Sequence, residues 1–336
     1  MPEKVKFEIS SWTVVKILLV IVAAAMIYIV RDVVALLFIV LVLVATFSPI
    51  IKSWQKYLSR IPAIIALFTL LIAVAAGVVY IIFPPLVNEF AQLAISVPSY
   101  ISETNFDSLR QYAPEIRNGL QSLSSNIGSI TTNVYSFTAG VFGAVFSLLM
   151  IIVLTFYMLV EESDIKKQVS AFFSEQDREK GIGVINKIAA KVGSWFRGQM
   201  LLGLVIFVID YVGLLIFGVP YALILALLAG LLEIIPTVGP FISGTIAVLF
   251  ALTISPWKAL FVAIFYMAVQ LLENNFLVPK IMQKAIGISP VVIIISVIVG
   301  AKLLGVIGAI LSIPIAASIS VIIIEWPTIS KMFSKE

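Results

Sequence analysis

The chain has 336 residues, of which 61% are hydrophobic and 12% are charged. The charged share is about half of that in an ordinary soluble domain, which excludes a soluble enzyme, a nucleic-acid-binding protein and a disordered chain. The chain has no Cys and no His, which excludes disulfides, thiol chemistry and imidazole metal sites. A formal net charge of +4 agrees with basic cytoplasmic loops in a membrane protein.

Three apolar runs predict an N-terminal scaffold of three spans within residues 1–83, because each run approaches the length that crosses a bilayer. The runs cover residues 14–30, 33–47 and 62–83. Arg31 and Asp32 separate the first two runs, which favours a tight hairpin over a single long helix. Pro84 and Pro85 are expected to end the third span.

A polar segment at residues 84–135 is expected to lie outside the cytoplasm. It carries four acids and two bases, and apolar residues recur every three or four positions from Leu109 to Phe137. This spacing predicts a long amphipathic helix that packs either on its own subunit or on a neighbouring subunit. We expect the helix to continue into a fourth span at residues 136–160.

Residues 161–199 carry seven bases and six acids, interleaved with aromatic and aliphatic residues. This mixture predicts cytoplasmic helices that lie on the membrane surface. A transport region is expected from residue 200 to residue 336, and it begins with a fifth span at residues 200–217. Because loops rich in Lys and Arg stay in the cytoplasm, the charges place both chain termini there.

Two further apolar stretches, at residues 221–252 and 290–324, are too long for one span and too short for two. Pro or Gly breaks each of them near its centre, which predicts two re-entrant helical hairpins. A full span at residues 256–278 then leaves Lys280 and Lys284 in the cytoplasm. We therefore predict an all-α polytopic integral membrane protein with about six full spans plus two hairpins. Eight full spans is the alternative.

Acidic residues inside the apolar segments are the main candidates for a functional site, because ionisable groups are costly in hydrocarbon. Asp210 lies within the fifth span, Glu233 precedes the break of the first hairpin, and Glu273 lies in the span that follows. Three amide residues adjoin Glu273 in sequence, namely Gln270, Asn274 and Asn275. Buried carboxylates and amides can bind a polar solute, a proton or an alkali cation.

Structural roles stay open for the same acids. Glu273 and its neighbours could hydrogen-bond helices together, and Glu233 could cap the hairpin turn. Asp210 could pair with Arg197 or lie at a subunit contact. The residues at the breaks are expected to gate the site: Pro236, Thr237, Gly239 and Pro240 in the first hairpin, and Gly305 and Gly308 in the second. The sequence indicates no metal site and no cofactor.

Three strings in the C-terminal third resemble motifs of the autoinducer-2 exporter (AI-2E) family. They read EIIPTVGPFI at residues 233–242, ENNFLVPKIM at residues 273–282 and GVIGAILSIP at residues 305–314. The resemblance implies a multi-pass plasma-membrane transporter that forms a homo-oligomer, expected to be a pentamer. Members of the family are linked to export of the signal autoinducer-2, and others to Na⁺(Li⁺)/H⁺ antiport.

Two positions depart from the family pattern. Ser48 stands where the family often has Asn, and Thr237 stands where Tyr commonly follows the Pro of the hairpin tip. These departures leave the identity of the solute open.

We therefore expect a secondary transporter or exporter of a small polar solute, embedded in the lipid bilayer, and not an enzyme or a nucleic-acid-binding protein. The alternative is a monovalent cation/proton antiporter that uses Asp210, Glu233 and Glu273. A channel, or a structural oligomer that does not transport, is the third reading.

Overall fold

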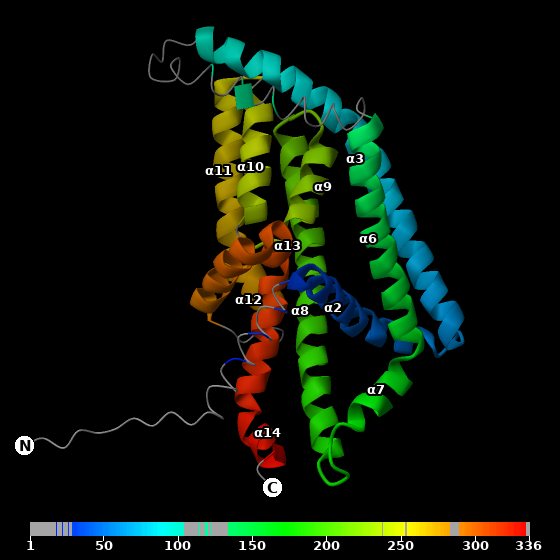
Figure 1. The fold of residues 1–336 in the computed structure, drawn as a ribbon. Coiled ribbons are helices and arrows are strands. Elements are labelled where there is room, and N and C mark those ends of the chain that lie inside the picture. Colours follow the sequence, from blue (N-terminus) through cyan, green and yellow to red (C-terminus); the bar gives the residue numbers. More distant parts are fainter. Residues whose placement is uncertain are drawn as a thin grey trace, which may run out of the picture.

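The computed structural model describes residues 29–103, 134–236, 238–252, 254–282 and 289–333, together with the single residues Leu18, Val22, Met26, Pro114, Asn118, Gly119 and Ser122. Residues 82–103, 134–145, 290 and 333 are described by their backbone alone. Throughout these described parts the chain is helical and forms no strand (Figure 1). The prediction of an all-α polytopic membrane protein is confirmed.

Apart from residues 104–133 and 283–288, which lie almost entirely outside the described residues, the helices follow one another with short connections. They are α2 (Arg31–Trp54), α3 (Arg60–Glu103), α6 (Val134–Val160), α7 (Glu162–Ser170), α8 (Arg178–Ile216), α9 (Ala222–Leu232), α10 (Val238–Leu252), α11 (Pro256–Leu272), the π-helix η1 (Glu273–Leu277), α12 (Val278–Met282), α13 (Pro290–Ile324) and α14 (Trp326–Phe333).

Five of the described helical segments are long and apolar enough to cross a membrane, or six if α6 and α7, which meet at an angle of 74°, count as one broken span. The five are Arg31–Trp54, Arg60–Ile81, Arg178–Ile216, Pro256–Met282 and Val291–Ile324. With 11 and 15 residues, α9 and α10 are each shorter than the roughly 20 residues that a crossing needs.

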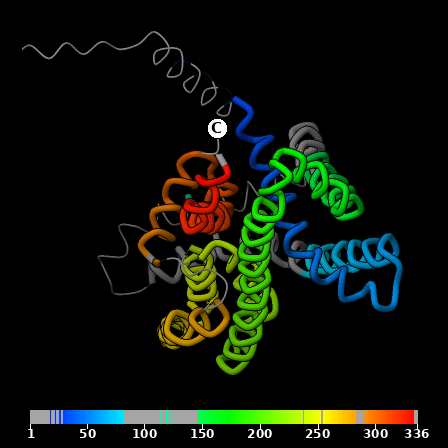
Figure 2. Tube along the Cα trace, turned by 90° about the horizontal axis from the view of Figure 1, so that it is seen from below, coloured from blue at the N-terminus to red at the C-terminus, as the bar shows by residue number. Residues whose placement is uncertain are grey.

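Helix α8 is the central element, and its 39 residues extend about 58 Å at 1.5 Å per residue. Seen along the long axis of the molecule in Figure 2, α3 and α6 lie on one side of α8, and α10, α11 and α13 lie on the other. The N-terminal helix α2 contacts α6, α8 and α13, so it joins the two sides.

A tight turn after α8 folds α9 back along it. Gly218 has a φ of 63° and Tyr221 a φ of 59°, which are left-handed values that reverse the chain within a few residues. The two helices then pack backbone to backbone, since a Cβ on Gly203 would lie 2.5 Å from the carbonyl oxygen of Gly230. The C-terminal end of α9 therefore lies beside the middle of α8.

The break between α9 and α10 is the first of two interruptions. Helix α9 ends at Leu232, α10 begins at Val238, and the two helices pack against each other as a hairpin. A Cβ on Gly239 would overlap the carbonyl oxygen of Leu232, so the turn closes only with glycine at this position.

The second interruption lies inside α13. Leu304 has φ and ψ of −135° and 15°, and Gly305 has 61° and −140°, which are not helical values. The limbs on either side meet at Gly300 and Gly308, where an added Cβ would overlap the backbone of the opposite limb. This bend falls within the region where the sequence predicts a break.

Both interruptions lie near the middle of α8. The C-terminal limb of α13 runs along the first half of α8, where Lys187 contacts Glu325 and Lys191 contacts Ser320. In Figure 1 the α9–α10 hairpin reaches this level from the upper end of the molecule, and the C-terminal limb of α13 leaves it toward the lower end.

Two expected boundaries are wrong. Pro84 and Pro85 do not end the third helix, because α3 continues to Glu103; it turns near the top of Figure 1 and contacts α9 and α10. A proline costs a helix one hydrogen bond and a bend, and α3 accommodates both.

The boundary at residues 199 and 200 is the second correction. Residues 178–199 are not separate surface helices, because they form the first half of α8. Trp195 is only 1% exposed and packs with Ile313 and Leu202, so the aromatic residues of this segment face the protein core.

Some expected features lie outside the described residues. The first span at residues 14–30 is represented there by a few single positions, and the amphipathic helix predicted from residue 109 falls largely within 104–133. Thr237 is also outside the described residues.

Candidate functional site: three buried carboxylates

Asp210, Glu233 and Glu273 are all buried, with 1%, 0% and 4% of their surface exposed. Asp210 is on α8, Glu233 is the residue that ends α9, and Glu273 begins the π-helix η1. The sequence separates them by 23 and 40 positions, and three different elements bring them to one level of the molecule.

The three carboxylates lie within electrostatic range of one another. Glu233 interacts with both Glu273 and Asp210, and Tyr266 on α11 lies beside Asp210. Both carboxylate oxygens of Glu233, Oδ1 of Asp210 and the hydroxyl of Tyr266 are buried without a hydrogen-bond partner. Unpaired polar atoms of this kind are rare in a folded interior and mark a site that binds something or stores strain.

No base balances these acids within the described residues. The ion pairs found there use Asp32, Glu162, Asp164, Asp177 and Glu325 as their acids. Three uncompensated carboxylates in an apolar surrounding are costly, because burial without a partner removes their hydration.

The proposed pairing of Asp210 with Arg197 is absent from the structure. Arg197 donates instead to the carbonyl oxygens of Ala45 and Thr46 on α2 and to the hydroxyl of Ser194. Glu233 does occupy the C-cap position of α9, but its carboxylate accepts no hydrogen bond there.

The π-helix divides the polar cluster that the sequence places around Glu273. Glu273 points into the protein, whereas Asn274 and Asn275 are exposed on the surface of the protomer. Gln270 donates to Oδ1 of Asn274 at 3.4 Å, and Asn275 donates to the carbonyl oxygen of Leu271 at 2.8 Å. A wider helical turn gives this division, and π-turns occur often at functional sites.

Gln199 is a site residue that the sequence does not reveal. Its side chain is 4% exposed, and its amide nitrogen donates to the backbone carbonyl oxygen of Glu233. This hydrogen bond ties the tip of the α9–α10 hairpin to the middle of α8. A lone glutamine in a segment rich in charges gives no sequence signal of such a contact.

The expected gating residues are not all alike. Pro236 and Pro240 are half-buried and Gly239 is buried, so the first tip is packed into the protein. Gly308 is buried, whereas Gly305 lies exposed at the bend of α13. Each interruption carries one charged side chain, Glu233 in the first and Lys302 in the second.

The carboxylate trio has no arrangement suited to a metal ion. Among the described residues, no group of three or more metal-ligating side chains is placed to hold one. Ionisable residues within membrane-spanning segments are typical of membrane proteins that move protons, ions or polar solutes.

The fold and the buried acids define a multi-pass α-helical membrane protein of the transport type. The sequence model of the family described as "AI-2E family transporter" matches residues 17–328, so the chain belongs to this family. The sequence resemblance to the family is thereby confirmed.

Relatives from several organisms carry transport names. YueF of Bacillus subtilis (strain 168), named as a transport protein, is 27% identical over 294 residues, which cover 81% of this chain and 78% of YueF. YrrI of the same organism, also named as a transport protein, is 35% identical over 173 residues, covering 52% and 49%. PerM of Escherichia coli (strain K12), named as a permease, is 24% identical over 252 residues, covering 73% and 69%.

Proposed function

We propose that the protein is a secondary transporter or exporter of a small polar solute, with an autoinducer-2-like molecule as the first candidate. The observation that carries the proposal is the meeting of Asp210, Glu233 and Glu273 at the α9–α10 interruption. Broken helices beside buried polar groups are the usual architecture of a solute site in a secondary transporter.

The exposed amides indicate where the solute passes. Asn274 and Asn275 lie on the surface of the protomer, within a helix that is apolar enough to span the membrane. Lipid chains offer amides no hydrogen bonds, so this surface needs water, a solute or another subunit against it. We assign Gln270, Asn274 and Asn275 to the wall of a polar path. Glu273 is assigned to the buried end of this path, where its carboxylate would bind the solute or an ion.

The two interruptions are the proposed gates. The α9–α10 hairpin, with Pro236, Thr237, Gly239 and Pro240 at or beside its tip, would gate from outside. The bend of α13, with Gly305 and Gly308, would gate from the cytoplasm. Gly239 and Gly305 lie at the two turns, and a few residues at such turns can absorb the motion of a gate.

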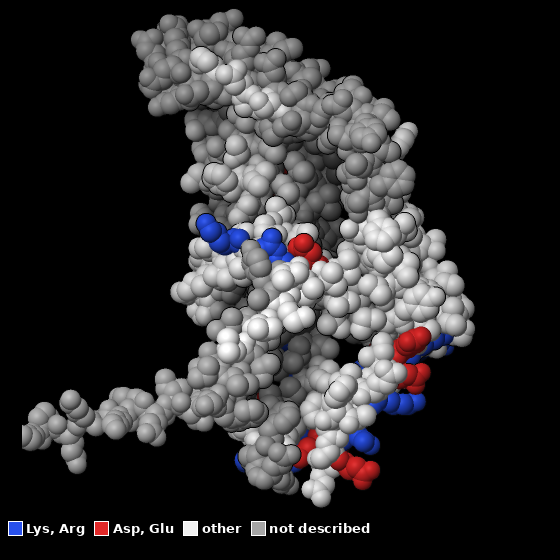
Figure 3. All heavy atoms as spheres, viewed as in Figure 1, with Lys and Arg blue, Asp and Glu red and all other residues white. Residues whose placement is uncertain are grey.

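Charge supports an orientation with both termini in the cytoplasm of a plasma-membrane protein. Figure 3 shows most of the visible Lys, Arg, Asp and Glu over the lower part of the molecule, around α7 and the lower end of α8, with a smaller group at about half its height. Basic segments stay on the cytoplasmic side, so this end faces inward. The C-terminal helix α14 ends at the same level in Figure 1.

A homo-oligomer, with a pentamer as the expected size, would cover the exposed polar groups at mid-height. Asp32 and Lys302 are both exposed on the protomer although apolar helices surround them. Groups of this kind rarely face lipid, and a subunit interface or a central aqueous path would accommodate them.

Reconstituted flux tests the proposal. We expect Glu273→Gln to lower solute uptake into proteoliposomes by about tenfold or more, the value of one hydrogen bond to a charged group. Glu325→Gln is the matched control, because Glu325 pairs with Lys187 at the cytoplasmic end. Equal flux in Glu273→Gln and wild type would overturn the assignment.

A Na⁺(Li⁺)/H⁺ antiporter is the second candidate, and it is favoured because no base among the described residues lies beside Asp210, Glu233 and Glu273. Addition of Na⁺ or Li⁺ to proteoliposomes that hold a pH gradient would then dissipate the gradient. Solute flux without cation-dependent proton movement would exclude this candidate.

A further inference from the structure

A second feature extends from the end of the molecule that we assign to the cytoplasm to Arg197, at the middle of α8. A cavity of about 450 Å³ opens between α2, α7 and α8, within the volume range of sites that bind small molecules. We name it the α2–α8 cavity. Its position places it at the depth of inner-leaflet lipid, provided that the proposed orientation is right.

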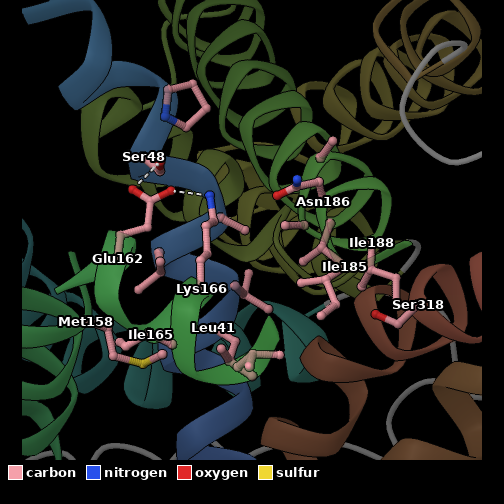
Figure 4. Close-up of a pocket in the computed structure, with 18 of the residues that line it drawn as sticks. Leu41, Ser48, Met158, Glu162, Ile165, Lys166, Ile185, Asn186, Ile188 and Ser318 are labelled. Atoms are coloured by element: carbon pink, nitrogen blue, oxygen red, sulfur yellow. Dashed lines mark hydrogen bonds and ion pairs between the residues drawn. The ribbon is translucent and has the colours of Figure 1, made fainter. Parts of the chain in front are cut away.

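The wall of the α2–α8 cavity is mostly aliphatic. Figure 4 shows Leu41, Met158 and Ile165 along one part of it and Ile185 and Ile188 along another. Such a surface suits a hydrocarbon chain, because an acyl chain has no polar group to leave unsatisfied against it. A small polar solute would gain nothing from this wall.

The rim has the opposite character. Ser48, Glu162 and Lys166 lie together on one side of the cavity, and Asn186 lies across from them (Figure 4). A ligand that fits both parts must be amphiphilic, with a chain against the aliphatic wall and a polar group at the rim.

The charge at the rim selects the polar group. Glu162 faces Lys52 at 3.7 Å, Arg60 at 3.1 Å and Lys166 at 2.7 Å. One carboxylate therefore meets three cations. Arg197, which also lines the cavity, contacts only neutral acceptors. The rim thus has a surplus of positive charge, and the side chains of Lys52 and Lys166 stay 62% and 41% exposed.

We propose that the α2–α8 cavity binds one acyl chain of an anionic phospholipid of the inner leaflet, with the phosphate held by Lys52 and Lys166. Basic pockets between helices on the cytoplasmic side suit such headgroups. Helix α7, bent by 74° from α6 and rich in charge, lies beside this site like a helix of the membrane surface.

The test uses the full chain, purified and delipidated in detergent, with palmitoyl-oleoyl phosphatidylglycerol and its phosphatidylcholine counterpart as probes. Native mass spectrometry counts bound lipid, and thermal unfolding reports stabilisation. We expect phosphatidylglycerol to bind at least about tenfold more tightly and to raise the melting temperature more, because it is anionic, whereas the cationic choline of phosphatidylcholine offsets its phosphate charge and is repelled by the two lysines.

Charge and cavity variants locate the site. Lys52→Gln and Lys166→Gln should each weaken phosphatidylglycerol binding about fivefold. Lys167→Gln is the matched control, because Lys167 is the next residue on α7, pairs with Asp164 and does not line the cavity. Ala189→Phe should fill the cavity and abolish binding of both lipids. If Lys166→Gln fails to fold, Lys52→Gln still decides, because Lys52 is the most distant of the three cations from Glu162.

Equal binding of both lipids, or unchanged binding in Ala189→Phe, would overturn the proposal. Another occupant is the N-terminal segment of the chain itself. Because the chain has no native Cys, a Leu18→Cys, Ile185→Cys pair reports on it. Rapid crosslinking of this pair in the delipidated protein would show that the segment fills the cavity and would also overturn the proposal. Neither readout depends on transport, so a failed flux assay leaves the lipid test intact.

Discussion

Two regions of this molecule bury carboxylates and balance them in opposite ways. At the cytoplasmic end, Glu162 meets three cations and the hydroxyl of Ser48. In the middle, Asp210, Glu233 and Glu273 meet no base among the described residues. The first arrangement joins α2, α3 and α7 and serves the fold. The second costs stability, which supports the proposed role of these acids in transport.

Glu233→Gln gives the largest contrast between the two regions. The amide keeps the shape of the side chain and removes the cost of burying an ionised group, so stability should stay equal or rise. Transport should fall about tenfold or more, because a charged contact is lost. Thermal unfolding and proteoliposome flux on the same preparation check both parts. A variant that loses stability and keeps its flux would place Glu233 with the structural acids.

The contrast between the two regions also requires that the tip of the α9–α10 hairpin hold Glu233 in a fixed position. Gly239→Ala puts a Cβ against the carbonyl oxygen of Leu232, and such overpacking costs about 1–3 kcal/mol. Gly183→Ala is the control, because a Cβ on Gly183 meets no atom within 4 Å and alanine favours a helix. Chemical unfolding of the two variants should show a loss for Gly239→Ala alone. Equal stabilities would mean that the tip yields easily and does not position Glu233.

Glu162→Gln should act in the opposite sense to Glu233→Gln. The substitution leaves three cations facing one another without a carboxylate, so stability should fall by about 1–3 kcal/mol. Flux, scaled to folded protein, should stay within about twofold, since no charged hydrogen bond at the transport site is removed. A variant as stable as the wild type would show that the cytoplasmic network contributes little.

The dependence on pH sharpens this prediction. Helix α7 is polar and lies outside the spans, and burial raises the pKa of Glu162. Hydrogen bonds from Lys166 and Ser48 outweigh burial, so its pKa lies below the ordinary value. A lowered pKa gives stability that is present above the unfolded pKa of about 4.3 and is lost as the pH falls through the folded pKa. The difference between wild type and Glu162→Gln should therefore shrink in acid.

Much of this arrangement could be predicted from the sequence because it depends on local rules. Composition predicts the membrane class, and Pro236 and Gly305 mark the two interruptions through their backbone geometry. Asp210, Glu233 and Glu273 could be identified as candidate site residues because acids within apolar segments are costly and rare.

Features that depend on long-range packing could not be predicted in this way. The three acids meet because Gly203 and Gly230 let α8 and α9 touch. The sequence predicts that Trp195 lies on the membrane surface, whereas in the structure it packs against Ile313, which is 118 positions away in the chain. The π-turn at Glu273 is set by what surrounds the helix, so the outward direction of Asn274 has no signature in the chain.

Substitution of Gln199 is expected to have the smallest effect on stability, and it tests whether the hairpin tip opens independently of the cytoplasmic network. Gln199→Ala removes the donor to the carbonyl oxygen of Glu233, and an unsatisfied buried acceptor costs about 1–3 kcal/mol, with the lower end expected where the tip can relax. Because the lost hydrogen bond ties the hairpin to α8, opening of the tip should increase more than global unfolding. Hydrogen exchange of the amides at residues 229–235 measures this opening. Faster exchange there, with α2 and α7 unchanged, would show that the tip moves independently of the cytoplasmic network. Uniform acceleration would instead join the two regions into one cooperative unit, and the gate would have to lie elsewhere.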